Sequence, residues 1–226
     1  MTDHTHAAKK ARQHTVYLTK SGMRVPGVTT ITGVMDKPAL KLWANRLGLQ
    51  GIEVNKYVDE LATIGTLAHY MIECHCRDIK PDLGDYTPNQ ISLAENSVIK
   101  WIMWQDSVKF IPTHNELKLV SERHLYGGTL DIIGKIGNRI TLVDIKTCKG
   151  IYGEHKTQVA GGYKILADEN GMKIDDVIIT RVGRNEEEGF QEVKVQAEEA
   201  MLHQRRFLHC LELYHDNKEI EDKYGR

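Results

Sequence analysis

The stretch GGTLDIIGKIGNRITLVDIKT, residues 127–147, decides the fold. Two apolar runs surround Gly137 and Asn138, a pair that is typical of the two-residue turn of a β-hairpin. Such a turn places Ile136 opposite Arg139 on two antiparallel strands. The stretch therefore predicts a hairpin whose register is fixed by its turn.

The predicted register brings three charged side chains together. It places Asp131 directly opposite Asp144, with their side chains roughly 5 Å apart. Lys146 is expected on the same face, because strand residues i and i+2 point the same way. Two carboxylates among apolar residues repel each other, and a divalent cation between them would offset that repulsion. Oxygen ligands favour magnesium or manganese, so we expect a metal site here, and we expect the loss of one carboxylate to stabilise the metal-free protein slightly.

A second interpretation of the same residues stays open. Lys146 alone would neutralise Asp131 and Asp144 in a partly exposed cluster of ion pairs. In that case the three charges would be structural, and no metal would be needed to hold them.

The neighbouring segments predict helices before the hairpin and alternating strands and helices after it. Apolar residues recur at helical spacing in the first half of the chain, and period-two runs follow in the second half. The predicted elements are a short hairpin over 15–25, helices over 28–35, 38–49, 57–77 and 91–110, strands over 115–122, 126–136 and 139–147, a helix over 153–170, strands over 175–183 and 190–195, and a helix over 196–214. This order predicts an α/β or α+β domain around a central sheet.

The composition fits one domain preceded by an arm. The chain has 226 residues, 41% of them hydrophobic, which is enough for one substantial core. We expect residues 1–14 to form a flexible arm with basic and histidine residues, and residues 15–226 to form a single domain. No apolar run fits a membrane span or a signal sequence, so we expect an intracellular, cytoplasmic protein. With a net charge of −1, polyanion binding would rest on local basic patches or on metal ions.

The hairpin resembles that of the PD-(D/E)XK nuclease superfamily, and in particular of its RecB-like exonuclease branch. In that branch the second acidic residue is often an aspartate followed by one residue and a lysine, as with Asp144 and Lys146. The segment GTLAHYMIE, residues 65–73, resembles the upstream helical motif of the branch. Residues 25–48 resemble N-terminal segments of phage and bacterial members and of the mitochondrial genome maintenance exonuclease. The resemblance covers about residues 16–163.

This resemblance implies a fold, a cofactor and a set of site residues. The implied fold is α/β, with a restriction-endonuclease-like core in which helices flank a mixed, mostly antiparallel central sheet, preceded by a helical N-terminal region. The implied cofactor is Mg²⁺, for which Mn²⁺ would substitute. Together with the hairpin register, the resemblance predicts metal ligation by His69, Glu116, Asp131, Asp144 and the carbonyl of Ile145, catalysis by Asp131, Asp144, Lys146 and Gln158, and substrate binding by Tyr163, Lys149, Arg205 and Arg206.

The match to the branch is incomplete. The branch usually places a glutamine and a tyrosine four residues apart on the helix after the hairpin. Gln158 and Tyr163 are five apart, about 140 degrees around an α-helix, so Gln158 fits the motif better than Tyr163. Two metal-ligand candidates also have ordinary alternatives. His69 would form a surface pair with Glu73 one helical turn away, and Glu116 would be an exposed strand residue.

The cysteines predict no further cofactor. Members of the branch that hold an iron–sulfur cluster have three cysteines near the C-terminus, whereas this chain has only Cys210 there, so no cluster is expected. Cys74 and Cys76 are separated by one residue, which is shorter than the usual spacing in zinc sites. We expect all the cysteines to be reduced thiols.

The hairpin and the family resemblance together predict a metal-dependent deoxyribonuclease that hydrolyses phosphodiester bonds, with an end-dependent exonuclease on single strands as the preferred form. Asp131 and Asp144 would hold the metal, and Lys146 would orient or help to deprotonate the attacking water. The expected partners are DNA and a phage or bacterial recombination or replication protein, without a membrane. Two alternatives stay open: a structure-selective endonuclease or resolvase of the same fold, and a non-catalytic DNA-binding protein.

Overall fold

A computed structural model describes residues 15–35 and 37–225, so the predicted arm over residues 1–14 lies outside the described part. The centre of the fold is a five-stranded sheet with the order β3-β4-β5-β6-β7. All neighbouring strands are antiparallel except β5 and β6, which are parallel. The strands are β3 (Phe110–Ser121), β4 (Tyr126–Ile136), β5 (Arg139–Lys146), β6 (Asp176–Val182) and β7 (Phe190–Val195). The predicted mixed, mostly antiparallel sheet is confirmed.

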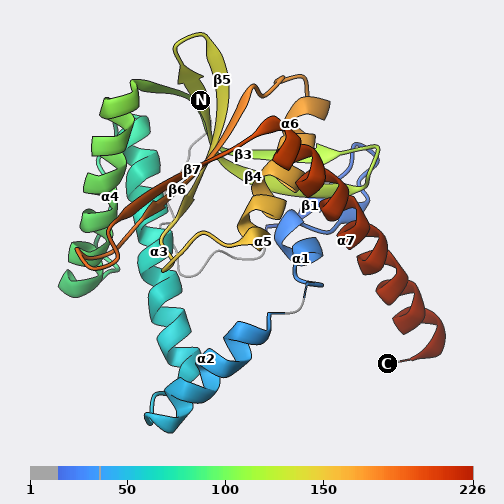
Figure 1. Ribbon diagram of the computed structural model, residues 1–226, viewed down its shortest axis with the longest axis horizontal. Helices are drawn as coiled ribbons and strands as arrows, with labels where there is room; N and C mark the ends of the chain where they lie inside the picture. The colour runs from blue at the N-terminus through green and yellow to red at the C-terminus, as the bar shows by residue number, and fades with distance from the viewer. Residues whose placement is uncertain (1–14, 36, 226) are drawn as a thin grey trace.

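Helices cover both faces of this sheet (Figure 1). One face packs against two long helices, α3 (Val54–Cys76) and α4 (Pro88–Val108). The other face packs against α1 (Val28–Thr32), the π-helix η1 (Thr157–Tyr163), α6 (Lys164–Glu169) and the first half of α7 (Ala197–Tyr224). The remaining elements are the small hairpin β1 (Tyr17–Leu18) and β2 (Arg24–Val25), with α2 (Pro38–Leu49) and α5 (Gly153–Lys156).

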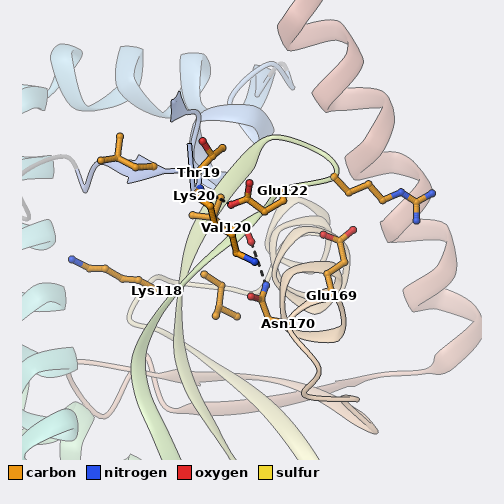
Figure 2. A pocket seen from close by; sticks show the side chains of 10 residues that line it. Thr19, Lys20, Lys118, Val120, Glu122, Glu169 and Asn170 are labelled. Carbon is orange, nitrogen blue, oxygen red and sulfur yellow. Dashed lines mark hydrogen bonds between the residues drawn. The ribbon is translucent and has the colours of Figure 1, made fainter. Parts of the chain in front are cut away.

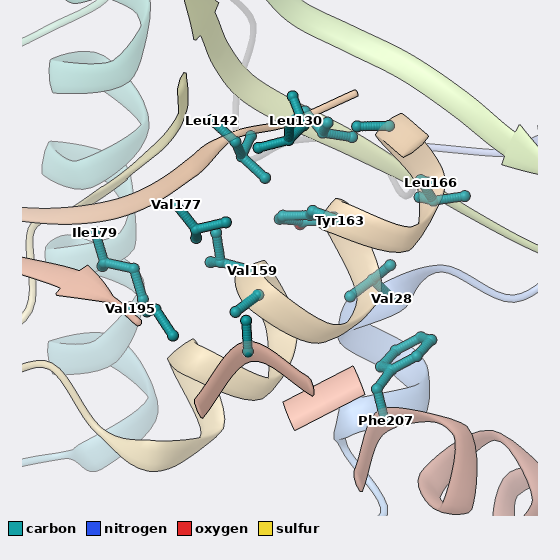
Figure 3. Packing of buried hydrophobic residues seen from close by; sticks show 14 of the residues in the cluster. Val28, Leu130, Leu142, Val159, Tyr163, Leu166, Val177, Ile179, Val195 and Phe207 are labelled. Atoms are coloured by element: carbon teal, nitrogen blue, oxygen red, sulfur yellow. The ribbon is translucent and has the colours of Figure 1, made fainter. Parts of the chain in front are cut away.

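Alternating side chains on the central strands explain why the sheet is covered twice. On β5, Leu142 joins the core beneath α7, whereas Val143 joins the core beneath α3 and α4. On β6, Ile179 joins the core beneath α7 and Ile178 joins the core beneath α3 and α4. Burying one such side chain contributes about 1.5–3 kcal/mol, so a strand that is apolar on both faces needs a helical layer on each. Figure 3 shows the first of these cores, in which the side chain of Phe207 reaches in from α7.

Helix α4 contributes much of the core beneath α3 and α4, and local sequence signals set the residue at which it begins. In α4, Thr87 and Gln90 form a capping box that satisfies two backbone N–H groups, and a proline occupies the first turn. Trp101 and Trp104 of α4 pack with Phe110 of β3 and are buried. No helix of the described residues is long and apolar enough to cross a membrane.

Element types and their order match the sequence prediction, but several ends differ. β3 already begins at Phe110 and α7 continues to Tyr224, whereas the predicted strand began at residue 115 and the predicted helix ended at 214. Lys109 ends α4 in a left-handed conformation, which lets β3 start at once. The cysteines at 74, 76, 148 and 210 are free thiols.

The segment after β5 differs most from the prediction. One continuous α-helix was expected over 153–170, but the structure has α5, then the π-helix η1, then α6. In a π-helix the backbone bonds join residues five apart, so Gln158 and Tyr163 come to the same side. The expected separation of about 140 degrees is therefore wrong. Gly161 makes room for α7 at this point, because a Cβ there would lie 2.7 Å from the carbonyl oxygen of His203.

Candidate active site

The two strands of the central hairpin separate at the predicted site. Pairing between β4 and β5 follows the predicted register from the turn as far as Ile132 and Val143. It ends there, so the predicted direct opposition of Asp131 and Asp144 is replaced by an opening between the strands. The carboxylate of Asp131 takes the place of a ladder bond, because its Oδ2 accepts a hydrogen bond of 2.9 Å from the backbone N–H of Ile145.

His69, Glu116 and Asp131 form the only group of potential metal ligands found among residues 15–35 and 37–225. Their ligand atoms all lie within 4.8 Å of one another. His69 Nδ1 is 3.5 Å from Asp131 Oδ2, so His69 faces the site, as expected for a ligand. The three residues come from α3, β3 and β4 and line a cavity of about 10 Å³, to which Ile145 also contributes. That volume suits one ion or one water molecule.

Glu116 reaches this cavity through an unusual backbone conformation. Its φ is 48°, in the left-handed region that residues other than glycine rarely adopt inside a strand. Strain of this kind costs about 1–3 kcal/mol and is concentrated at functional sites. The alternative in which Glu116 is simply an exposed strand residue is wrong, because the residue is partly buried beside two other ligand candidates.

Glu116→Gly is expected to stabilise the metal-free protein by about 1 kcal/mol, because glycine adopts positive φ without strain and one carboxylate is removed from beside Asp131. The same variant should lose most of the rise in Tm that Mg²⁺ gives to the wild type. Thermal unfolding in EDTA and in Mg²⁺ measures both effects. Lys173→Gly is the matched control, since Lys173 has a φ of 46° on the exposed surface and should keep the full response to Mg²⁺. A lower metal-free Tm for Glu116→Gly would contradict the assignment.

A chain of polar contacts runs from Asp144 into the π-helix. Lys146 Nζ lies 2.8 Å from Asp144 Oδ2 and donates a hydrogen bond of 3.1 Å to Gln158 Oε1. Gln158 Nε2 in turn donates to the Tyr163 hydroxyl at 2.8 Å. Tyr163 is only 6% exposed, so its predicted role in substrate binding does not fit its position. It instead holds Gln158, which holds Lys146.

The electrostatics of the site favour added positive charge. Burial raises the pKa of Asp144, Lys146 opposes the rise, and the neighbouring Asp131 adds to it. Burial lowers the pKa of Lys146, but the carboxylates of Asp144 and Asp131 outweigh burial and raise that pKa overall. Both groups therefore retain their protons more strongly than usual. A divalent cation would offset the negative charge of the carboxylates as those protons do. The ion-pair interpretation without metal stays open, but its cluster is buried: Asp144 is 1% exposed.

The oxygen atoms of the site test whether a metal ion fits. Asp144 lies outside the group of three ligands, and its Oδ2 is ion-paired with Lys146 at 2.8 Å. Asn115 Oδ1 is a buried oxygen without a hydrogen-bond partner among the described residues. A buried oxygen without a hydrogen bond costs about 1–3 kcal/mol, and an ion or its bound water would remove that cost. One imidazole with several oxygen donors suits a divalent cation.

No protein-family model and no curated protein sequence matches this chain. Among solved structures, the alkaline exonuclease LHK-Exo from Laribacter hongkongensis is 12% identical with a TM-score of 0.35, over 69% of this chain and 82% of that one. The crystal structure of SSO0001 is 14% identical with a TM-score of 0.32, over 66% and 84% respectively. These scores are low, so the functional proposal rests on the residues of the site.

The other predicted residues lie outside the buried cluster. Lys149, Arg205 and Arg206 are exposed, and the guanidinium of Arg206 lies close to Gly153 at the start of α5. Their role as DNA contacts stays a prediction. Sequence reasoning missed His155, whose pKa is lowered to about 4 by burial and by the nearby Lys146. Nothing in the polar run around His155 indicated this position.

A larger hollow of about 540 Å³ lies between the β1–β2 hairpin, β3 and α6 (Figure 2). Its wall mixes both signs of charge, with Lys20 and Lys118 beside Glu122 and Glu169. The backbone N–H of Lys20 donates to Glu122 Oε1 at 2.8 Å, so part of this charge is already used. We therefore assign the candidate site to the smaller cavity, because it is lined by the group of metal-ligand candidates. The larger size of the hollow does not decide the assignment.

Proposed function

We propose that the protein is a metal-dependent deoxyribonuclease of the PD-(D/E)XK kind, built on a restriction-endonuclease-like core. One observation supports this most strongly. At the point where β4 and β5 separate, Asp131 belongs to a group of metal-ligand candidates, and the neighbouring strand supplies Asp144 with Lys146 ion-paired to it. A buried acidic pair with a lysine at this position is suited to metal-assisted hydrolysis of a phosphodiester.

His69, Glu116 and Asp131 would hold the ion, with Asp144 and the carbonyl of Ile145 next to it. When bound, the ion supplies positive charge to the scissile phosphate and lowers the pKa of a bound water.

Lys146 is the residue that would act on the attacking water. Gln158 fixes the position of its Nζ, and Tyr163 fixes Gln158. With its Nζ held between Asp144 and Gln158, Lys146 is suited to orient the water and to stabilise developing negative charge. Both roles predicted for this lysine, orienting the water and helping to deprotonate it, remain part of this proposal.

We infer further that the substrate is single-stranded DNA that enters by a free end. α2 and the first part of α3, the helix that carries His69, form an arm that projects beyond the sheet (Figure 1). α2 buries none of its residues, and its Trp43 lies 6.2 Å from Tyr57 of α3, ring centre to ring centre. Lys37 joins the start of α2 to Glu154 of α5 by an ion pair of 2.8 Å. Trp43 and Tyr57 are partly exposed, and Lys41 and Arg46 of α2 are exposed. Aromatic and basic residues on such an arm suit the stacking of unpaired bases.

Cleavage of end-labelled DNA in different metals tests the proposed chemistry. Mg²⁺ and Mn²⁺ should support cleavage, whereas Ca²⁺ should permit binding with poor cleavage, because its larger and looser shell positions water less well. His69→Ala should need about tenfold more Mg²⁺ for half-maximal rate. His75→Ala, on the same helix but exposed, is the control and should titrate like the wild type. An unchanged Mg²⁺ titration for His69→Ala would remove His69 from the site.

A further inference from the structure

Asn115 lies next to Glu116 on β3 and lines the same cavity as the three metal-ligand candidates. Its side-chain Oδ1 is buried and accepts no hydrogen bond from any residue that the structure describes. A buried amide oxygen in this state is rare, because it has lost its water without gaining another donor. Something that binds an oxygen lone pair is therefore expected at this position.

The backbone of β3 explains how two successive residues reach one cavity. Neighbouring residues of a regular strand face opposite sides of the sheet. The left-handed conformation of Glu116 breaks this alternation, and both Asn115 and Glu116 line the cavity. The register beyond Glu116 is kept, since Asn115 pairs with Ile132 and Leu117 with Leu130. The distortion is thus confined to the place where the ligand group assembles.

We propose that Asn115 Oδ1 is a further ligand of the divalent ion held by His69, Glu116 and Asp131. This inference rests on the metal site of the proposed function. Amide oxygens are good ligands for hard cations such as Mg²⁺ and Mn²⁺. A neutral ligand adds coordination without adding to the repulsion between Glu116 and Asp131, which matters in a buried site. Asn115 therefore raises the affinity for the ion at little electrostatic cost.

Mn²⁺ binding, followed by the electron paramagnetic resonance signal of the free ion, tests this role without using activity. Asn115→Leu should weaken Mn²⁺ binding about tenfold while its metal-free Tm stays equal to that of the wild type or rises. Asn115→Asp restores an oxygen ligand and should bind Mn²⁺ at least as tightly as the wild type. Its metal-free Tm should fall, because a further carboxylate joins those of Glu116 and Asp131 in the cavity.

Gln105→Leu is the matched control, since Gln105 Oε1 on α4 is also buried without a hydrogen-bond partner among the described residues but does not line the cavity of the ligand group. It should leave Mn²⁺ affinity unchanged. Unchanged affinity in Asn115→Leu, or a loss of affinity that Asn115→Asp does not restore, would overturn the role of Asn115 alone. Failure of the wild type to bind Mn²⁺ would instead overturn the metal site of the proposed function.

Discussion

Asp144→Asn and Lys146→Ala are each expected to slow DNA cleavage in Mg²⁺ by roughly a thousandfold or more. Asp144→Asn removes a carboxylate next to the ion, and Lys146→Ala removes the group that orients the attacking water. Asp131→Ala should be equally inactive, because Asp131 belongs to the ligand group and also accepts the N–H of Ile145. Single-turnover cleavage of end-labelled DNA at saturating Mg²⁺ measures the loss.

Stability separates this catalytic effect from misfolding. The sequence predicted a slight gain in metal-free stability on losing one of two repelling carboxylates. For Asp144 the structure instead predicts a loss of metal-free stability of about 3 kcal/mol, because removing its carboxylate leaves Lys146 buried without its ion-pair partner. The double variant Asp144→Asn/Lys146→Met removes both charges. It should recover much of that stability and still be inactive.

Arg139→Met is the matched control for these variants. Arg139 lies on the same strand as Lys146 but at the opposite end, and it pairs with Asp176 at 2.6 Å. The substitution removes an ion pair from β5 without touching the site, so the cleavage rate should stay near that of the wild type. Near-normal turnover in a folded Lys146→Ala or Asp144→Asn variant would refute the assignment of the active site.

A circular single strand is expected to stay intact over a period in which the same sequence, linearised once, is fully degraded in Mg²⁺. In the proposed model the DNA enters by a free end along the arm of α2 and α3, and a single strand is flexible enough to enter where a duplex would first have to melt. Gel analysis of the two DNA forms at equal nucleotide concentration measures the difference.

The same experiment decides between this model and the endonuclease alternative. Cleavage of the circle at a rate like that of the linear strand would remove the end requirement and favour a structure-selective endonuclease. Binding of both forms without cleavage in either Mg²⁺ or Mn²⁺ would favour the non-catalytic DNA-binding alternative. A linear duplex with blunt ends should be degraded more slowly than the linear single strand, because its strands must separate before entry.

The hairpin and its charges were predictable because they depend on local rules. The turn at Gly137 and Asn138 fixes the register over the pairs from Ile136 to Ile132, and period-two alternation places Lys146 beside Asp144. The end of the pairing just before Asp131 was not predictable in this way. It depends on a side-chain bond to Ile145 that competes with the backbone ladder.

The parts of the site that the sequence did not indicate depend on tertiary contacts. Helical periodicity cannot distinguish an α-helix from a π-helix over a few residues, so the alignment of Gln158 with Tyr163 appeared only in the structure. The backbone conformation of Glu116 was not predictable either, because nothing in a strand-like run signals a positive φ at a glutamate. Asn115 gained its significance only from the cavity that this conformation creates.

The most direct test of the metal-dependent site is one Mn²⁺ titration in which metal binding and DNA cleavage are both measured. Mn²⁺ occupancy is read from the resonance signal of the free ion, and cleavage of a labelled linear single strand is measured in the same samples. A nuclease that uses the ion at His69, Glu116 and Asp131 should not cleave DNA in excess EDTA, and its cleavage rate should rise in proportion to Mn²⁺ occupancy. The Asp131→Asn variant should lose both Mn²⁺ binding and DNA cleavage. Cleavage by the wild type in excess EDTA, or full Mn²⁺ occupancy without cleavage of any DNA form, would contradict it.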